Sequence, residues 1–90
     1  MAHATAIHVK GAKGDFHKLD EAIEKGPMPP DGLLMHLVRP TQEGFEILDV
    51  WQQARDANTF LTERVELALQ NLGLPFSRQP DSEVWGMARP

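Results

Sequence analysis

His36 and Asp49 are the two side chains in this sequence whose types and spacing could together perform chemistry. They lie in two short apolar segments, residues 33–39 and 45–51, which five residues separate. An aspartate that accepts a hydrogen bond from one imidazole nitrogen orients the ring and leaves the other nitrogen free to take a proton from a substrate. The pair therefore predicts a general base. The alternative is a buried, hydrogen-bonded histidine that only holds two strands together.

The spacing of the two segments predicts a β-hairpin, and the hairpin decides which side chains share a face. If Gln42 and Glu43 are the central turn residues, positions whose numbers sum to 85 lie opposite each other. A slip of one residue in the turn would place the histidine and the aspartate on opposite faces. In the favoured register one face carries three facing pairs, which are His36 with Asp49, Leu34 with Trp51, and Val38 with Ile47.

Aromatic side chains on the same face would suit a planar ligand. Trp51 and Phe45 have the same alternation as the aspartate, so we expect both to wall a ligand site by stacking. A structural role in the core is the alternative for each of them. The apolar remainder of the expected site is Leu34, Val38 and Ile47. A few polar groups that converge in an apolar surface are typical of small-molecule pockets.

Composition argues against several other kinds of chemistry. The sequence contains no cysteine, and its four histidines show no close paired spacing, so we expect no disulfide, no metal site and no cofactor. A net charge of −4 argues against nucleic acid or an anionic membrane as a partner, because both attract a cationic surface. The sequence shows no basic leader and no long apolar stretch, and we expect a cytoplasmic protein.

One small domain, residues 1–90, must position these side chains. Alternating β-branched residues predict a first strand over residues 4–10. Asp15 can cap a short helix that Gly26 and Pro27 end.

A longer helix is predicted over about residues 53–72, because apolar side chains recur there at spacings of three and four. Its stripe consists of Ala57, Phe60, Leu61, Arg64, Val65, Ala68, Leu69 and Leu72. Residues 82–88 predict a last strand, which follows a turn-rich segment at residues 78–81.

The order of these elements is β-α-β-β-α-β, which is the ferredoxin-like pattern of an α+β fold. Its four-stranded antiparallel sheet carries two helices on one face. Residues 33–38 and 45–51 are apolar on both faces, so we expect both strands to be buried on both sides. Two helices cover one face only, and an uncovered apolar face indicates a partner or a ligand. A homodimer is the simplest prediction.

Several segments resemble the dimeric α+β barrel superfamily, in particular small bacterial proteins of the antibiotic biosynthesis monooxygenase-like group. They are Gly32-Leu-Leu-Met-His36, Pro40-Thr-Gln-Glu-Gly-Phe45 and Ile47-Leu-Asp-Val-Trp51, followed by Phe60-Leu61 and Glu63-Arg64. The resemblance implies two sheets that face each other as a barrel, with a cavity lined by the face of each sheet that carries no helices. Members of the superfamily include cofactor-free monooxygenases of aromatic polyketides, haem-degrading enzymes and lactone isomerases. Fold alone does not choose among these activities.

One activity in this group fits the residues poorly. Trp51 matches the position of a cavity tryptophan in haem-degrading relatives, but the first strand lacks their asparagine. Leu69 stands near the position of their helix histidine. We therefore expect neither haem degradation nor a haem cofactor.

The function that the sequence favours is that of a homodimer that binds a small apolar or aromatic molecule between its sheet and its helices. As an enzyme it would be a cofactor-free monooxygenase or a proton-transfer enzyme, with His36 as the base and Asp49 as its orienting group. The alternative is a non-catalytic ligand-binding or structural dimer. An open pocket around His36 favours the first hypothesis, and a filled interior favours the second.

Overall fold

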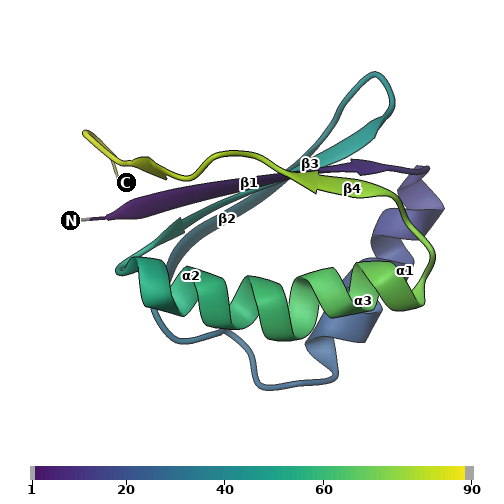
Figure 1. Ribbon diagram of the computed structural model, residues 1–90, viewed down its shortest axis with the longest axis horizontal. Coiled ribbons are helices and arrows are strands. Elements are labelled where there is room, and N and C mark those ends of the chain that lie inside the picture. The colour runs from purple at the N-terminus through teal and green to yellow at the C-terminus, as the bar shows by residue number, and fades with distance from the viewer. Residues whose placement is uncertain (1, 89–90) are drawn as a thin grey trace.

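The computed structural model describes residues 2–88 as one antiparallel sheet with helices on one of its faces (Figure 1). The strands and helices are β1 (His3–Lys10), α1 (Lys13–Glu24), β2 (Leu33–Pro40), β3 (Gly44–Trp51), α2 (Ala54–Phe60), the π-helical turn η1 (Leu61–Val65), α3 (Glu66–Asn71), β4 (Phe76–Arg78) and β5 (Ser82–Glu83). The strand order is β2-β3-β1-β4, and β5 pairs with the beginning of β1. This topology confirms the predicted ferredoxin-like α+β fold.

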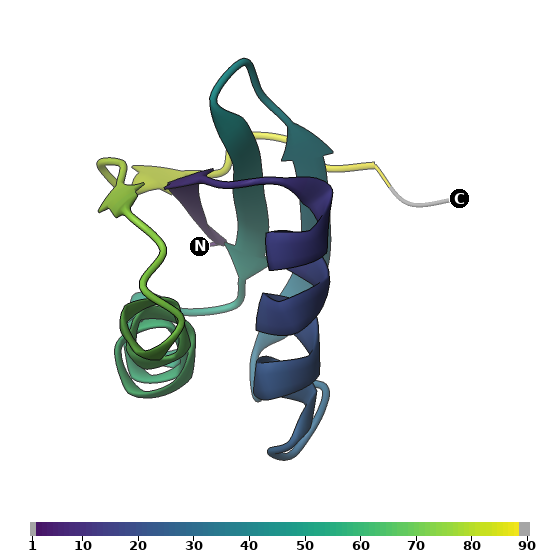
Figure 2. The same cartoon turned by 90° about the vertical axis from the view of Figure 1, so that its right-hand side faces the viewer.

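Both helices cover the same face of the sheet. Figure 2 looks along the continuous helix formed by α2, η1 and α3, with α1 standing beside it. The core lies between this helical layer and the sheet, because alternate residues of β1 and β3 point towards the helices. The buried apolar side chains of this core are Ile7, Val9, Leu19, Phe45, Ile47, Trp51, Ala57, Phe60, Leu61, Val65 and Leu69.

The first helix begins two residues before the expected cap. Asp15 lies inside α1, and its carboxylate accepts a hydrogen bond from the backbone N–H of Ala12 at 2.8 Å. A carboxylate in the first turn also interacts favourably with the helix dipole. Asp15 therefore stabilises the beginning of the helix from its third position and not from the cap itself.

The long helix was predicted correctly in extent, and its middle turn is π-helical. The predicted buried stripe is present at Phe60, Leu61 and Val65. Leu72 departs from the prediction, because it lies beyond the last helical residue and is 37% exposed. Gly73 then adopts a left-handed backbone with a φ of 69°, which glycine accommodates without strain and which ends the helix.

The last predicted strand is wrong in position. The fourth strand of the sheet is β4, and only two residues of the predicted 82–88 strand pair with β1. Phe76 packs against the core and anchors β4, whereas Trp85 is 93% exposed and anchors nothing within the described chain. Anchoring by an apolar side chain thus decides which segment completes the sheet.

The face of the sheet away from the helices is only partly covered. β2 is an edge strand, and Met35 and Leu37 are 38% and 46% exposed, so the expected burial of this strand on both sides does not occur within one chain. β3 lies between two strands and is mostly buried. Among the described residues, no helix is both long and apolar enough to cross a membrane.

Candidate functional site

The β2–β3 hairpin has the predicted register from the turn to Met35, and it contains a bulge between Met35 and Leu33. Residues opposite each other include His36 with Asp49 and Val38 with Ile47, as the turn arithmetic predicts. The register shifts between Leu33 and Met35, so Leu33, and not Leu34, lies opposite Trp51. The bulge inserts one extra residue between Leu33 and Met35, so the pairing is shifted by one position on the side away from the turn and Leu34 is not opposite Trp51.

His36 and Asp49 form the predicted hydrogen-bonded pair. The Nδ1–H of His36 donates to Oδ1 of Asp49 at a distance of 2.5 Å. The aspartate side chain is only 3% exposed, whereas the imidazole is 48% exposed. The hydrogen bond to Asp49 raises the pKa of His36 above its usual value, and the negative charges of Asp49 and Asp20 act in the same direction, against the opposing effect of burial. Within residues 2–88, Nε2 of His36 has no hydrogen-bond partner.

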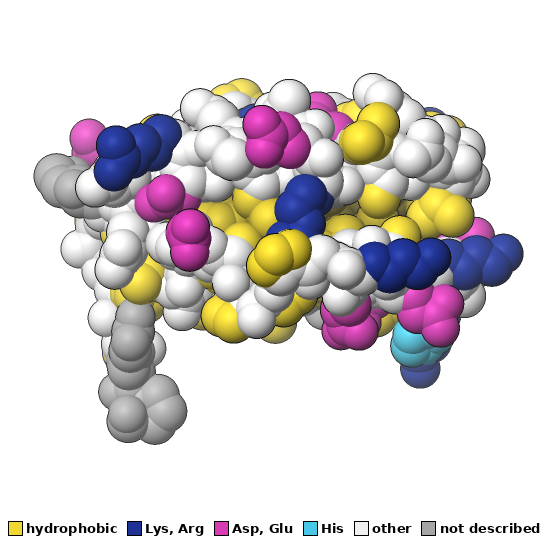
Figure 3. All heavy atoms as spheres, turned by 90° about the horizontal axis from the view of Figure 1, so that it is seen from below, with side chains coloured by type: hydrophobic (Ala, Val, Ile, Leu, Met, Phe, Trp, Pro, Cys, Tyr) yellow, Lys and Arg dark blue, Asp and Glu magenta, His cyan; other side chains and the backbone are white. Residues whose placement is uncertain are grey.

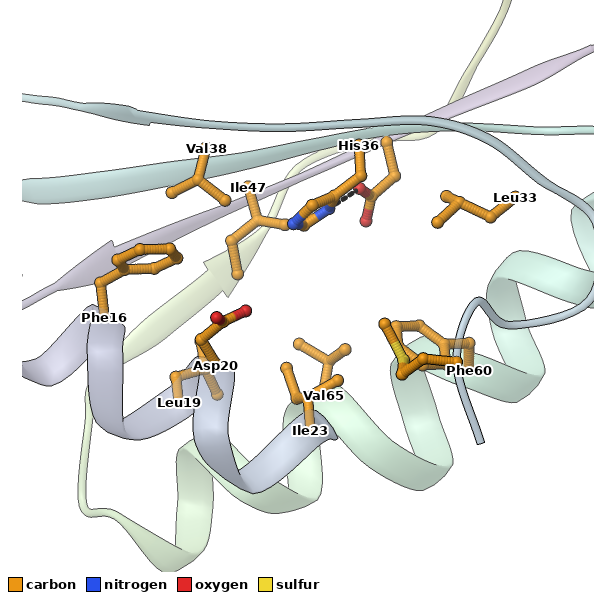
Figure 4. A pocket seen from close by; sticks show the side chains of 12 residues that line it. Phe16, Leu19, Asp20, Ile23, Leu33, His36, Val38, Ile47, Phe60 and Val65 are labelled. Carbon is orange, nitrogen blue, oxygen red and sulfur yellow. Dashed lines mark hydrogen bonds and ion pairs between the residues drawn. The ribbon is translucent and has the colours of Figure 1, made fainter. Parts of the chain in front are cut away.

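This pair faces a cavity between the sheet and the helices (Figure 4). The side chains around it are Phe16, Leu19, Asp20, Ile23, Met28, Leu33, His36, Val38, Ile47, Asp49, Phe60 and Val65. This cavity therefore lies on the helical face of the sheet, as the favoured function expects. The barrel cavity that the family resemblance implies would lie between the open faces of two copies, and it stays a prediction. Seen from the helical side, a band of apolar side chains runs through the middle of the surface with charged side chains around it (Figure 3).

The cavity is small, with a volume of about 60 Å³. For comparison, an apolar cavity that holds benzene has a volume of roughly 150 Å³. An aromatic ring therefore cannot be enclosed beside His36 unless a lining side chain moves. Met28 is the lining side chain best placed to do so, because it is 48% exposed and lies in the proline-rich connector between α1 and β2.

The two expected aromatic walls lie behind the cavity. Trp51 is fully buried, and its Nε1–H donates to Oγ1 of Thr5 at 3.0 Å. Its ring packs against Phe60, with 5.6 Å between the ring centroids, and Phe60 occupies the place on the cavity that Trp51 was expected to have. Alternation along β3 predicts the face to which Trp51 points, but it does not predict that Phe60 of the long helix covers Trp51.

Phe45 also lies behind the cavity, because Phe16 of α1 packs against it and lines the cavity in its place. It is buried, and its ring meets Phe16 of α1 edge to face at 5.7 Å. Of the five predicted ligand-contacting residues, Val38 and Ile47 line the cavity, whereas Leu34, Phe45 and Trp51 do not.

The remaining lining residues come mostly from the helices, and the sequence analysis did not assign them to the site. A usable signal was present in α1, where Phe16, Leu19, Asp20 and Ile23 share one helical face. An acidic residue on an otherwise apolar stripe is unusual unless it serves a site. No such signal marked Met28, because a connector has no periodicity.

Arg64 ties the connector beside the cavity to the long helix. Its guanidinium donates to the carbonyl oxygens of Pro27, at 2.6 Å, and of Ile23, and it lies 4.8 Å above the ring of Phe60. A positive charge at the last carbonyls of α1 also complements the dipole of that helix. This explains why a cation stands on the apolar stripe of the long helix and how the connector that carries Met28 is held.

The donor set does not suggest a metal centre. Within residues 2–88, no three histidine, aspartate or glutamate side chains gather closely enough to hold a metal ion. The chemistry that the cavity itself offers is therefore that of one imidazole and two carboxylates in an apolar surround.

Two solved structures share this fold along almost the whole chain. A protein from Chloroflexus aurantiacus J-10-fl, described as a candidate antibiotic biosynthesis monooxygenase, aligns with a TM-score of 0.65 and 14% identity over 99% of this chain and 98% of its own. A Deinococcus radiodurans protein with the same description aligns with a TM-score of 0.56 and 20% identity over 99% of this chain and 100% of its own.

These likenesses define the fold. No protein-family model matches the sequence, and no curated protein matches it significantly. The chain shares the α+β fold of these two proteins, in agreement with the fold that the sequence resemblance implied. Identities of this size do not transfer an activity, which must be argued from the site.

Proposed function

We propose that this chain forms a cytoplasmic homodimer that binds a small aromatic metabolite and uses His36 as a general base. The observation that carries the proposal is that Asp49 holds Nδ1 of His36 and leaves Nε2 free beside an apolar cavity. A base needs both features, because the ring must be fixed and its second nitrogen must reach the substrate.

The reaction would begin with transfer of a proton from a hydroxyl or an acidic C–H group of the substrate to Nε2. Asp49 stabilises the imidazolium that results. In a proton-transfer enzyme the same proton then returns to another atom of the substrate. In a cofactor-free monooxygenase the deprotonated substrate would supply the electrons that reduce dioxygen, as the wider fold group suggests.

Because the neutral imidazole is the base, activity should rise with pH as His36 loses its proton. Its raised pKa moves this rise to a pH above the usual histidine value of about 6.5. Replacement of His36 by Gln should lower turnover about 10²- to 10⁴-fold. Dioxygen consumption and product formation are measured with each aromatic compound that binds. If His36→Gln turns over such a compound as fast as the wild type does, His36 is not the general base.

Binding itself can be screened by thermal shift, because a ligand that binds only the folded state raises its stability. The small cavity predicts that Met28→Ala, which removes the most exposed apolar lining side chain, should increase the thermal shift produced by bicyclic aromatic compounds. Leu67→Ala is a matched control, since Leu67 is 51% exposed and does not line the cavity.

The small volume also favours the alternative function, a non-catalytic ligand-binding or structural dimer. In that case His36 and Asp49 would act only as a hydrogen-bonded pair that joins β2 to β3. Binding of aromatic compounds without any turnover, in the wild type and in His36→Gln alike, would support this alternative.

The open face of the sheet supports the proposed homodimer. Met35, Leu37 and Leu48 lie on it, and the first two are strongly exposed in the single chain. Two such faces packed together would remove these side chains from water. Light scattering at micromolar concentration should give the mass of a dimer, and Leu37→Lys should give that of a monomer. Leu67→Lys places the same charge on α3 and should stay dimeric, whereas a monomeric wild type would refute the dimer.

A further inference from the structure

Asp20 is the one charged side chain that α1 contributes to the cavity. It lies on the same helical face as Leu19 and Ile23, and in Figure 4 its carboxylate points towards the cavity, opposite the ring of His36. Asp49, which lies behind the imidazole, is occupied by its bond to Nδ1. The free Nε2 and the carboxylate of Asp20 therefore face one shared space.

The fold does not need a carboxylate at this position. Asp20 is partly buried, and within residues 2–88 its carboxylate has no hydrogen-bond or ion-pair partner. A carboxylate among apolar side chains costs stability relative to an apolar residue unless it is paired. A ligand that donates a hydrogen bond to Asp20 would offset this loss of stability.

The charges around the cavity also favour one class of ligand. Its charged or titratable lining residues are Asp20, His36 and Asp49, so the site is net negative even when the imidazole is protonated. A ligand with a second negative charge would be repelled at short range in a medium of low dielectric constant. A hydroxyl or amino group can instead donate to Asp20 while it lies within reach of Nε2.

We propose that Asp20 determines specificity, selecting ligands that carry a hydroxyl or amino donor and no negative charge. This inference rests on the proposed function, because it concerns the ligand of the same cavity. It narrows the substrate class from aromatic molecules in general to neutral or cationic ones, such as phenols and arylalkylamines, and it excludes aromatic carboxylates.

Three ligands of similar size test the proposal: p-cresol, benzylamine and benzoate. The dissociation constants are measured from ring shifts of His36 in NMR titrations of the full chain. The wild type should bind p-cresol and benzylamine more tightly than benzoate. Asp20→Asn should shift the preference for benzylamine over benzoate by about tenfold towards benzoate, because it removes a charge-assisted hydrogen bond and a repulsive charge.

Glu21→Gln is the matched control, since Glu21 is the neighbouring exposed residue of α1 and its replacement changes the net charge equally. It should leave the preference unchanged. A second readout needs no ligand, because Asp20→Asn should lower the pKa of His36 whereas Glu21→Gln should not.

The outcomes separate this inference from the proposed function. Binding of the ligands by Asp20→Asn with the wild-type preference would overturn the role of Asp20 and leave the proposed ligand cavity intact. Failure of all three ligands and of the wider aromatic screen to bind the wild type would overturn the proposed function, and this inference with it.

Discussion

Two histidine–carboxylate pairs lie on opposite faces of the same sheet, and only one of them has the features of a base. On the helical side, His36 donates to Asp49 at 2.5 Å beside the cavity. On the open side, Nε2 of His8 lies 2.7 Å from a carboxylate oxygen of Glu46, whose other oxygen accepts a hydrogen bond from Arg39 at 2.7 Å. Both carboxylates are mostly buried.

The difference is the presence of a competing cation. Arg39 is permanently charged, and its hydrogen bond is the largest reason why the pKa of Glu46 lies below its usual value. The negative charge of Glu46 is thus shared with a guanidinium. The side-chain bond of Asp49 goes to a histidine instead, and it raises the pKa of that histidine. A histidine beside a carboxylate is therefore not sufficient evidence for a base, since the charge balance and the cavity must also fit.

The largest expected effect concerns the packing of the two faces. Leu61 of η1 is fully buried in the core between the helices and the sheet, whereas Leu37 is 46% exposed on the open face. Leu61→Ala should lower the free energy of unfolding by about 2 to 5 kcal/mol at every protein concentration, because it leaves a cavity in the core. Leu37→Ala should cost within about 0.5 kcal/mol when the chain is dilute.

The unfolding free energies of Leu61→Ala, Leu37→Ala and the wild type are compared by urea unfolding at several protein concentrations. If a second chain covers the open face, the cost of Leu37→Ala should grow with concentration, because association stabilises only the folded dimer. A loss below about 0.5 kcal/mol for Leu61→Ala would contradict its burial.

The helical side was also the side that the sequence predicted better. Alternation in the strands placed His36, Asp49, Val38 and Ile47 on one face, because the turn fixes the register by counting. The bulge at Leu34 could not be counted, since the extra residue is accommodated by backbone geometry that no side-chain pattern records.

The sequence also does not predict how deeply a core side chain is buried. The alternation of side chains along β3 predicts the face to which Trp51 points. The packing of the long helix over that face determines that Phe60, and not Trp51, lines the cavity. Asp20 could have been found from its place on the apolar stripe of α1, whereas the short fourth strand at Phe76 could not, because three residues carry too little periodicity.

A smaller effect would test the comparison of the two pairs directly. Asp49→Asn keeps the shape of the side chain and removes its charge, so it should lower the pKa of His36. Glu46→Gln is the equivalent change on the open face and should leave the pKa of His36 where it is. NMR titration of the His36 ring measures both, and an equal fall in the two variants would show that the pKa of His36 reflects overall charge and not its bond to Asp49.

The smallest expected effect is the pH dependence of stability that the His36–Asp49 pair confers. Because the pKa of His36 is higher in the folded chain than in the unfolded chain, the extra stability is fully present below the unfolded value of about 6.5. It is lost as the pH rises through the folded pKa. The difference in unfolding free energy between the wild type and His36→Gln, measured at a fixed protein concentration, should therefore shrink across this interval. In an Asp49→Asn background the pH-dependent part should largely vanish, since the main cause of the raised pKa is gone. A difference that stays constant with pH in both backgrounds would mean that His36 contributes to stability by packing alone. The His36–Asp49 and His8–Glu46 pairs would then differ in their packing and not in the protonation of their histidines.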